Sequence, residues 1–93
     1  MNKIVIYSDN DVEFSFEDAG DGIALLHCTA NTISPSKLKL WYSVFANAKQ
    51  IMKDYGFNRF MTVSPNPKFC EMFGGKYFED FGTTHKVYVW ELD

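Results

Sequence analysis

The sequence predicts an α+β fold in which a twisted, mostly antiparallel sheet of about six strands carries one long and one short helix. Short apolar segments with alternating side chains occupy both ends of the chain. The middle instead repeats apolar residues every three or four positions, which is typical of a helix. An expected strand on each side of this helix predicts a right-handed crossover between two parallel strands. The 93 residues fit a single domain, 1–93.

The first third of the chain predicts three strands. Segments 4–7 and 12–16 are both rich in apolar residues, and the second alternates apolar and polar side chains. Turn-forming residues separate them, so they predict a hairpin. Segment 23–28 is almost continuously apolar, which is typical of a strand covered on both faces. We therefore expect this third strand to lie in the centre of the sheet.

The remaining segments complete the order strand, strand, strand, helix, strand, helix, strand, strand. The long helix is expected to begin at Ser34-Pro35 and to end at Gly56, because serine caps helices, proline suits the first turn and glycine suits the C-terminal cap. Asn66-Pro67 repeats this start for a short helix through about residue 73. The three remaining strands are expected at 60–63, 77–81 and 85–92.

Composition and charge exclude several classes of protein. With 46% hydrophobic and 17% aromatic residues, the chain is not a disordered segment. No apolar run is long enough for a membrane span, so we expect a cytoplasmic protein. The pI of about 5.2 argues against a dedicated nucleic-acid-binding protein, although residues 32–70 are basic between two acidic ends. We expect Cys28 and Cys70 to be reduced thiols, and their spacing predicts no metal site.

From about Ile23 to Leu92, which is most of the chain, the sequence resembles the GNAT superfamily of N-acetyltransferases. The residues that carry this resemblance are Val63-Ser64-Pro65-Asn66 at a strand end and Phe69-Cys70-Glu71-Met72-Phe73-Gly74 in the short helix. From Ser34 to Leu92 the layout is similar to that of small acetyltransferase-like internal virion proteins of short-tailed phages. The resemblance implies a GNAT-like fold, acetyl-CoA as cofactor if the protein is active, and, for a phage protein, the host cell cytoplasm.

The resemblance also implies where a coenzyme would bind. GNAT enzymes hold its pyrophosphate on a glycine-rich loop before the long helix, where backbone N–H groups and the helix end attract an anion. Residues 29–36 contain no glycine here. The hydroxyl groups of Thr32, Ser34 and Ser36 and the charge of Lys37 are the available replacements.

Two residues are candidates for the chemistry. The resemblance places Cys70 where the family has a tyrosine that acts as general acid. His27, at the end of the expected central strand, is the candidate general base because of its titration range. The alternatives are that Cys70 is a small core residue and that His27 bonds to the backbone. Cys28 and His27 are strand neighbours that point to opposite faces, so they do not form a nucleophile pair.

Two functions follow from these observations. The preferred one is a GNAT-like domain with an eroded coenzyme A site that binds another macromolecule, namely a host or virion protein. The alternative is an acetyl-CoA-dependent N-acetyltransferase. Candidate partner surfaces are the acidic first hairpin and the aromatic final strand, which also predicts a homodimer. Their residues are Asp9, Asp11, Glu13, Tyr88 and Trp90. The alternative for Tyr88 and Trp90 is packing under the chain's own N-terminal hairpin.

Overall fold

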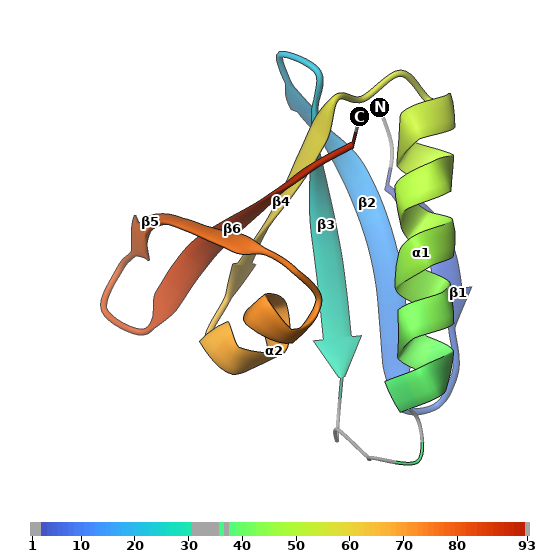
Figure 1. Ribbon diagram of the computed structural model, residues 1–93, viewed down its shortest axis with the longest axis horizontal. Coiled ribbons are helices and arrows are strands. Elements are labelled where there is room, and N and C mark those ends of the chain that lie inside the picture. The colour runs from blue at the N-terminus through green and yellow to red at the C-terminus, as the bar shows by residue number, and fades with distance from the viewer. Residues whose placement is uncertain (1–2, 31–35, 37, 93) are drawn as a thin grey trace.

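Figure 1 shows the computed structural model, which describes residues 3–30, 36 and 38–92. One six-stranded sheet carries two helices on one of its faces. The elements in chain order are β1 (Ile4–Ser8), β2 (Val12–Gly20), β3 (Ile23–Ala30), α1 (Leu38–Asp54), β4 (Arg59–Ser64), α2 (Pro67–Met72), β5 (Lys76–Phe81) and β6 (His85–Glu91). This order and the α+β class confirm the predicted fold.

The strands lie in the order β1-β2-β3-β4-β6-β5. All neighbours are antiparallel except β3 and β4, which are parallel, as the crossover through α1 requires. The parallel register pairs Leu25 with Met61. β3 is therefore an inner strand of the sheet, as its nearly continuous apolar sequence predicts.

Helix α1 covers the sheet with one apolar stripe. Trp41, Phe45, Ala48 and Met52 are buried at three- and four-residue spacing, so each turn contributes one residue to the core. Gly56 follows the helix with a φ of 95°, a left-handed conformation that glycine adopts without steric cost. The predicted helix start at Ser34-Pro35 lies outside the described residues.

The short helix α2 begins as the sequence predicts. The Asn66 side-chain oxygen accepts a hydrogen bond from the Phe69 N–H at 3.2 Å, and Pro67 occupies the first turn. Phe73, which follows α2, packs against Phe45 of α1 with ring centroids 4.9 Å apart. Both helices therefore lie on the same face of the sheet.

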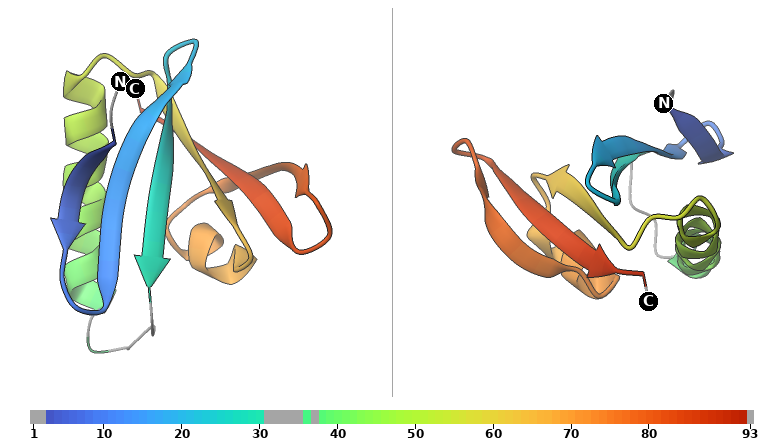
Figure 2. Two further views of the ribbon diagram at one scale, coloured as in Figure 1. Left: turned by 180° about the vertical axis from the view of Figure 1, so that it is seen from behind. Right: turned by 90° about the horizontal axis from the view of Figure 1, so that it is seen from above.

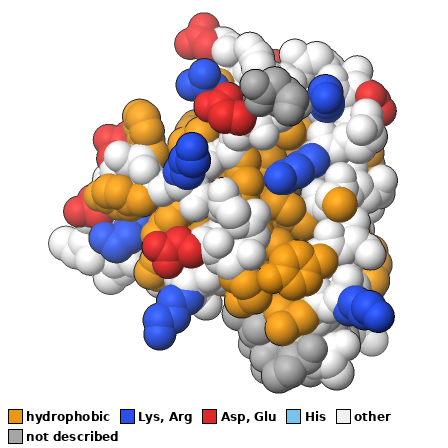
Figure 3. All heavy atoms as spheres, in the orientation of Figure 1, with side chains coloured by type: hydrophobic (Ala, Val, Ile, Leu, Met, Phe, Trp, Pro, Cys, Tyr) orange, Lys and Arg blue, Asp and Glu red, His pale blue; other side chains and the backbone are white. Residues whose placement is uncertain are grey.

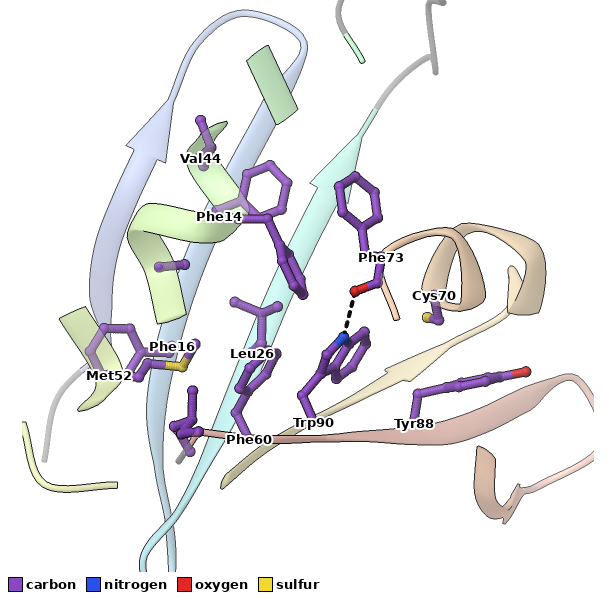
Figure 4. Close-up of a cluster of buried hydrophobic side chains, with 14 of the residues drawn as sticks. Phe14, Phe16, Leu26, Val44, Met52, Phe60, Cys70, Phe73, Tyr88 and Trp90 are labelled. Atoms are coloured by element: carbon purple, nitrogen blue, oxygen red, sulfur yellow. Dashed lines mark hydrogen bonds between the residues drawn. The ribbon is translucent and has the colours of Figure 1, made fainter. Parts of the chain in front are cut away.

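The final strand contributes its aromatic residues to the core. Tyr88 and Trp90 are 2% and 5% exposed. Trp90 stacks on Phe60 with ring centroids 4.8 Å apart, and its Nε1–H donates to the Phe73 carbonyl at 3.0 Å (Figure 4). The expected partner surface at Tyr88 and Trp90 is therefore wrong, because these side chains are needed between β6 and the helices. They do not pack under the N-terminal hairpin either, because β3 and β4 separate β6 from β1 and β2 in the sheet.

The other face of the sheet, here called the open face, carries neither of the two described helices. In Figure 2 (left) the strands β1, β2 and β3 lie in front of α1 on this side. Side chains alternate along β6, so Val87 and Val89 point away from the core that Tyr88 and Trp90 enter. Val87 is buried but is not part of the main core cluster, which confirms this orientation.

Candidate functional site

The sheet opens between its two parallel strands. The β3–β4 register pairs only three residues on each strand and ends at Leu25 and Met61. One residue further on, the Thr62 Oγ1 hydroxyl donates to the Leu26 carbonyl at 2.8 Å. This buried side-chain bond takes the place of the next backbone bond. Beyond it the strands are no longer paired with each other, and a gap begins.

Backbone polar groups line this gap. Because the Leu26 carbonyl points toward β4, alternation directs the N–H and C=O of Cys28 to the same side. The same rule directs the N–H and C=O of Val63 on β4 toward β3. The β3–β4 register ends before these two residues, so neither finds a ladder partner in the opposite strand. An extended ligand with its own amide groups can pair with such edges.

A cavity of about 360 Å³ adjoins the gap on the helix side. Figure 3 shows the corresponding hydrophobic surface at the centre of the molecule, beside α1. Most lining side chains are apolar, and the Asn66 and Thr62 side chains already bond to the protein backbone. The lining residues are Phe14, Leu26, Cys28, Phe45, Thr62, Val63, Ser64, Pro65, Asn66, Phe69, Cys70, Phe73 and Trp90.

Both cysteines line this cavity, one from each side. Cys28 comes from β3 and Cys70 from α2, and both are free thiols. Burial raises the pKa of Cys28 to about 11, and the charge interaction with Cys70 adds to the effect. Burial also raises the pKa of Cys70, although a hydrogen bond with Ser64 opposes this. Both thiols therefore stay protonated at neutral pH. Figure 4 shows Cys70 on α2, beside Phe73 and Trp90.

His27 lies on the open face, away from the cavity. Its Nε2 is 2.7 Å from Oε1 of Glu17, and the side chains of this pair are 42% and 40% exposed. The structure therefore does not bring His27 and Cys70 together in one pocket, because Leu26 and Cys28 face the helices and His27 faces the opposite way. His27 is two residues beyond the last paired residue of β3, so it borders the gap.

Glu17 and Thr62 are site residues that the sequence interpretation missed. The register of the β2–β3 hairpin places Glu17 opposite Leu25 and on the same face as His27. An extended alternation through residue 17 was visible in the sequence and would have indicated its face. Nothing in the sequence marked Thr62, because its role depends on where β3 and β4 separate.

The predicted coenzyme-binding residues lie at the start of α1. Thr32, Ser34 and Lys37 are outside the described residues. Ser36 is described and exposed. Because only one of these four residues is described, their role in binding the coenzyme phosphates stays a prediction.

Some acidic side chains of the first hairpin bond to neighbouring groups of the chain itself. Asp9 Oδ1 accepts hydrogen bonds from the N–H groups of Asp11 and Val12 at 2.8 and 2.9 Å, which shapes the turn. Glu13 forms an ion pair with Lys3 at 3.2 Å. The turn residue Asp9 therefore has a structural role, and partner binding by Asp9, Asp11 and Glu13 stays a prediction.

The described part of the chain holds no group of three or more histidine, cysteine or acidic residues placed to bind a metal ion. Its helices also include none that is both long and apolar enough to cross a membrane.

Two solved structures share this fold. One is a candidate acetyltransferase of the GNAT family from Desulfovibrio desulfuricans, with a TM-score of 0.61 and 17% identity over 89% of this chain and 70% of that one. The other is a candidate phosphinothricin N-acetyltransferase, with a TM-score of 0.61 and 16% identity over 89% of this chain and 61% of that one. No model of a protein family and no curated protein matches the sequence. The resemblance to phage virion proteins gains no support from these neighbours. The chain therefore has the GNAT-like α+β fold of these acetyltransferase structures.

Proposed function

We propose that this domain binds an acyl-coenzyme A between β3 and β4 and transfers the acyl group to an amine. The observation that carries the proposal is the gap between the two parallel strands, with unpaired backbone edges at Cys28 and Val63 and the Cys70 thiol beside it. The fold neighbours described as acetyltransferases support the same reaction class.

The residues present fit the pantetheine arm of coenzyme A. That arm is an extended chain with two amide groups, and the gap offers N–H and C=O groups that can pair with amides. The apolar lining of the adjoining cavity suits the alkyl segments of such an arm. When bound, acetyl-CoA supplies an acyl group activated as a thioester. The start of α1 would hold the phosphates of the coenzyme, and Ser36 is the predicted phosphate-binding residue that lies within the described part of the chain.

Two proton-transfer roles follow for the chain's own residues. The Cys70 thiol, held protonated by its raised pKa, donates a proton to the departing sulfur. His27, oriented by Glu17, accepts the proton that the amine loses on attack. These two groups border the gap from opposite faces of the sheet, so the acyl donor and the amine approach from different sides.

Thermal denaturation with and without acetyl-CoA tests the proposal. A hundredfold excess over the dissociation constant stabilises the folded state by about 2.7 kcal/mol, which gives a clear rise in Tm. Cys28→Phe fills the cavity and should abolish this rise. Val5→Phe is the control, because Val5 is exposed on the edge strand β1 and does not line the cavity, so it should leave the rise unchanged. No rise in the wild-type protein would contradict the proposal.

A second candidate function is binding of another protein through β5. Tyr77, Phe78 and Phe81 are all more than half exposed on this edge strand, which is typical of an interaction surface. This function needs no coenzyme. If acetyl-CoA produces no thermal shift and a variant of these three residues loses a partner protein, the binding function is favoured over acyl transfer.

A further inference from the structure

We infer that the acceptor is a primary amine attached to an apolar group, and that it binds on the open face beside the gap. This inference rests on the proposed acyl transfer and names the class of its second substrate. The open face offers an apolar strip for the body of such a molecule and a carboxylate at one end for its ammonium group.

The apolar strip crosses three neighbouring strands. The registers pair Leu25 of β3 with Met61 of β4, and Met61 with Val89 of β6. Directly paired residues have Cβ atoms about 4.5–5.5 Å apart, so the three side chains form a continuous row. Val63 and Val87 are paired in the next row toward the gap. Leu25, Met61 and Val89 are each only half-buried, so the strip is accessible to a ligand.

The two ends of this row differ in charge. Glu17 pairs with Leu25 at one end, and Lys76 pairs with Val89 at the other. Glu79 pairs with Val87 on the same strand as Lys76, so the β5 end carries one charge of each sign. An ammonium group is therefore attracted to Glu17, whereas at the β5 end the repulsion by Lys76 offsets the attraction by Glu79. The charges therefore direct the amine end of a ligand toward Glu17 and leave its apolar body over Met61.

This orientation places the amine beside the proposed base. Glu17 is in contact with His27 at 2.7 Å, and His27 borders the gap. Arg59 and Glu91 pair with each other at 3.7 Å at the opposite end of the strands, so they add little net charge near the gap. An amine held at Glu17 is thus next to a proton acceptor and to the opening through which the acyl donor is reached.

The strip distinguishes an apolar amine from a polar one. A chain bearing hydroxyl or carboxyl groups would lose their hydration over Leu25, Met61 and Val89 without gaining a hydrogen bond from these side chains. An arylalkyl or alkyl body instead removes apolar surface from water on both molecules. We therefore expect 2-phenylethylamine to bind and ethanolamine to bind much more weakly.

Titration of the isotope-labelled full chain with 2-phenylethylamine, followed by NMR, tests the inference. We expect amide shifts at Leu25, Met61 and Val89, and about tenfold weaker binding in Met61→Gln. Met72→Gln is the matched control, because Met72 is exposed on α2, and it should bind like the wild type. In the same way, Glu17→Gln should weaken binding and Glu71→Gln should not.

Three results with small molecules would overturn the inference. They are equal binding of ethanolamine, equal binding of phenylacetate, which lacks the amine, and shifts confined to residues outside the strip. Binding of an apolar peptide regardless of whether its N-terminus is acetylated would instead indicate a protein-docking face and would also overturn it. The titration needs no coenzyme, so it can succeed where the acetyl-CoA thermal shift fails. The two proposals therefore fail separately.

Discussion

Thr62 of β4 is hydrogen-bonded to Leu26 of β3 at the point where these two parallel strands separate. The Thr62 hydroxyl donates to the Leu26 carbonyl at 2.8 Å, and both residues are buried or nearly so. The Thr62 side chain therefore satisfies the Leu26 carbonyl, which is the last carbonyl of β3 that points toward β4 before the gap. This bond allows β4 to diverge from β3 without leaving a buried acceptor unpaired.

Thr62→Val should destabilise the protein because it leaves the Leu26 carbonyl without its donor. The expected loss in the free energy of unfolding is about 1–3 kcal/mol, the cost of an unsatisfied buried polar group. Urea denaturation measures it. Thr62→Ser keeps the hydroxyl and should recover most of the loss that depends on the hydrogen bond. Equal destabilisation by valine and serine would show that packing, and not this bond, is what matters.

Gly75→Ala should also be destabilising, through a steric clash with Trp90. A Cβ atom at position 75 would lie 2.5 Å from Cζ2 of the Trp90 ring. Overpacking of this kind costs about 1–3 kcal/mol. In a Trp90→Phe background the outer ring atoms are absent, so the same glycine substitution should cost much less. A double-mutant cycle measured by urea denaturation would detect this coupling, and additive effects would contradict the close contact.

The Cys28 thiol should make stability fall at alkaline pH. Its pKa is raised from the ordinary value of 9.0 to about 11 in the folded protein. Between these values the unfolded chain releases the proton while the folded chain keeps it, so the unfolded state gains stability as pH rises. The contribution is fully present below pH 9 and is lost as the pH rises toward about 11. Urea midpoints at pH 8 and pH 10.5 should therefore differ less in Cys28→Ala than in the wild type.

Cys70→Ala should lower the turnover of acyl transfer by about a hundredfold, the scale of a lost general acid. Acetyl-CoA affinity should change little, because alanine preserves the backbone of α2 and leaves the Cys28 and Val63 edges intact. Steady-state kinetics together with calorimetry separate the two effects. Cys28→Ala, on the other wall of the cavity, is the matched control and should retain turnover. Full activity in Cys70→Ala would remove the proposed acid role.

Self-association should depend on β5 and not on the residues of β6. Every residue of β5 is exposed, and Phe78 is 65% exposed on this edge strand. Phe78→Ser should therefore reduce the average mass measured by light scattering at tens of micromolar. Val5→Ser, on the opposite edge strand β1, tests whether any exposed apolar edge residue has the same effect. A wild-type protein that is strictly monomeric under these conditions would contradict the predicted homodimer.

The sequence by itself determined the elements and their order. The Asn66-Pro67 start of α2 is a local signal that depends on capping and backbone sterics. The helical spacing from Trp41 to Met52 depends on a single apolar face of α1. Each signal can be identified from neighbouring residues in the sequence. The parallel contact between β3 and β4 followed from the strand-helix-strand order, because a helical crossover is the usual connection between two parallel strands. The position of Cys70 at the cavity also follows from the order of the elements, because the short helix that carries it comes directly after β4.

Only the tertiary structure decided which faces these side chains occupy and what they meet. Trp90 is hidden because Phe60 and Phe73 cover it, and the sequence alone does not reveal a contact between residues 17 positions apart. The pairing of His27 with Glu17 depends on the hairpin register, and the gap depends on where Thr62 meets Leu26. Periodicity specifies the face of a side chain relative to its own element, whereas burial, register and strand separation arise from packing between elements.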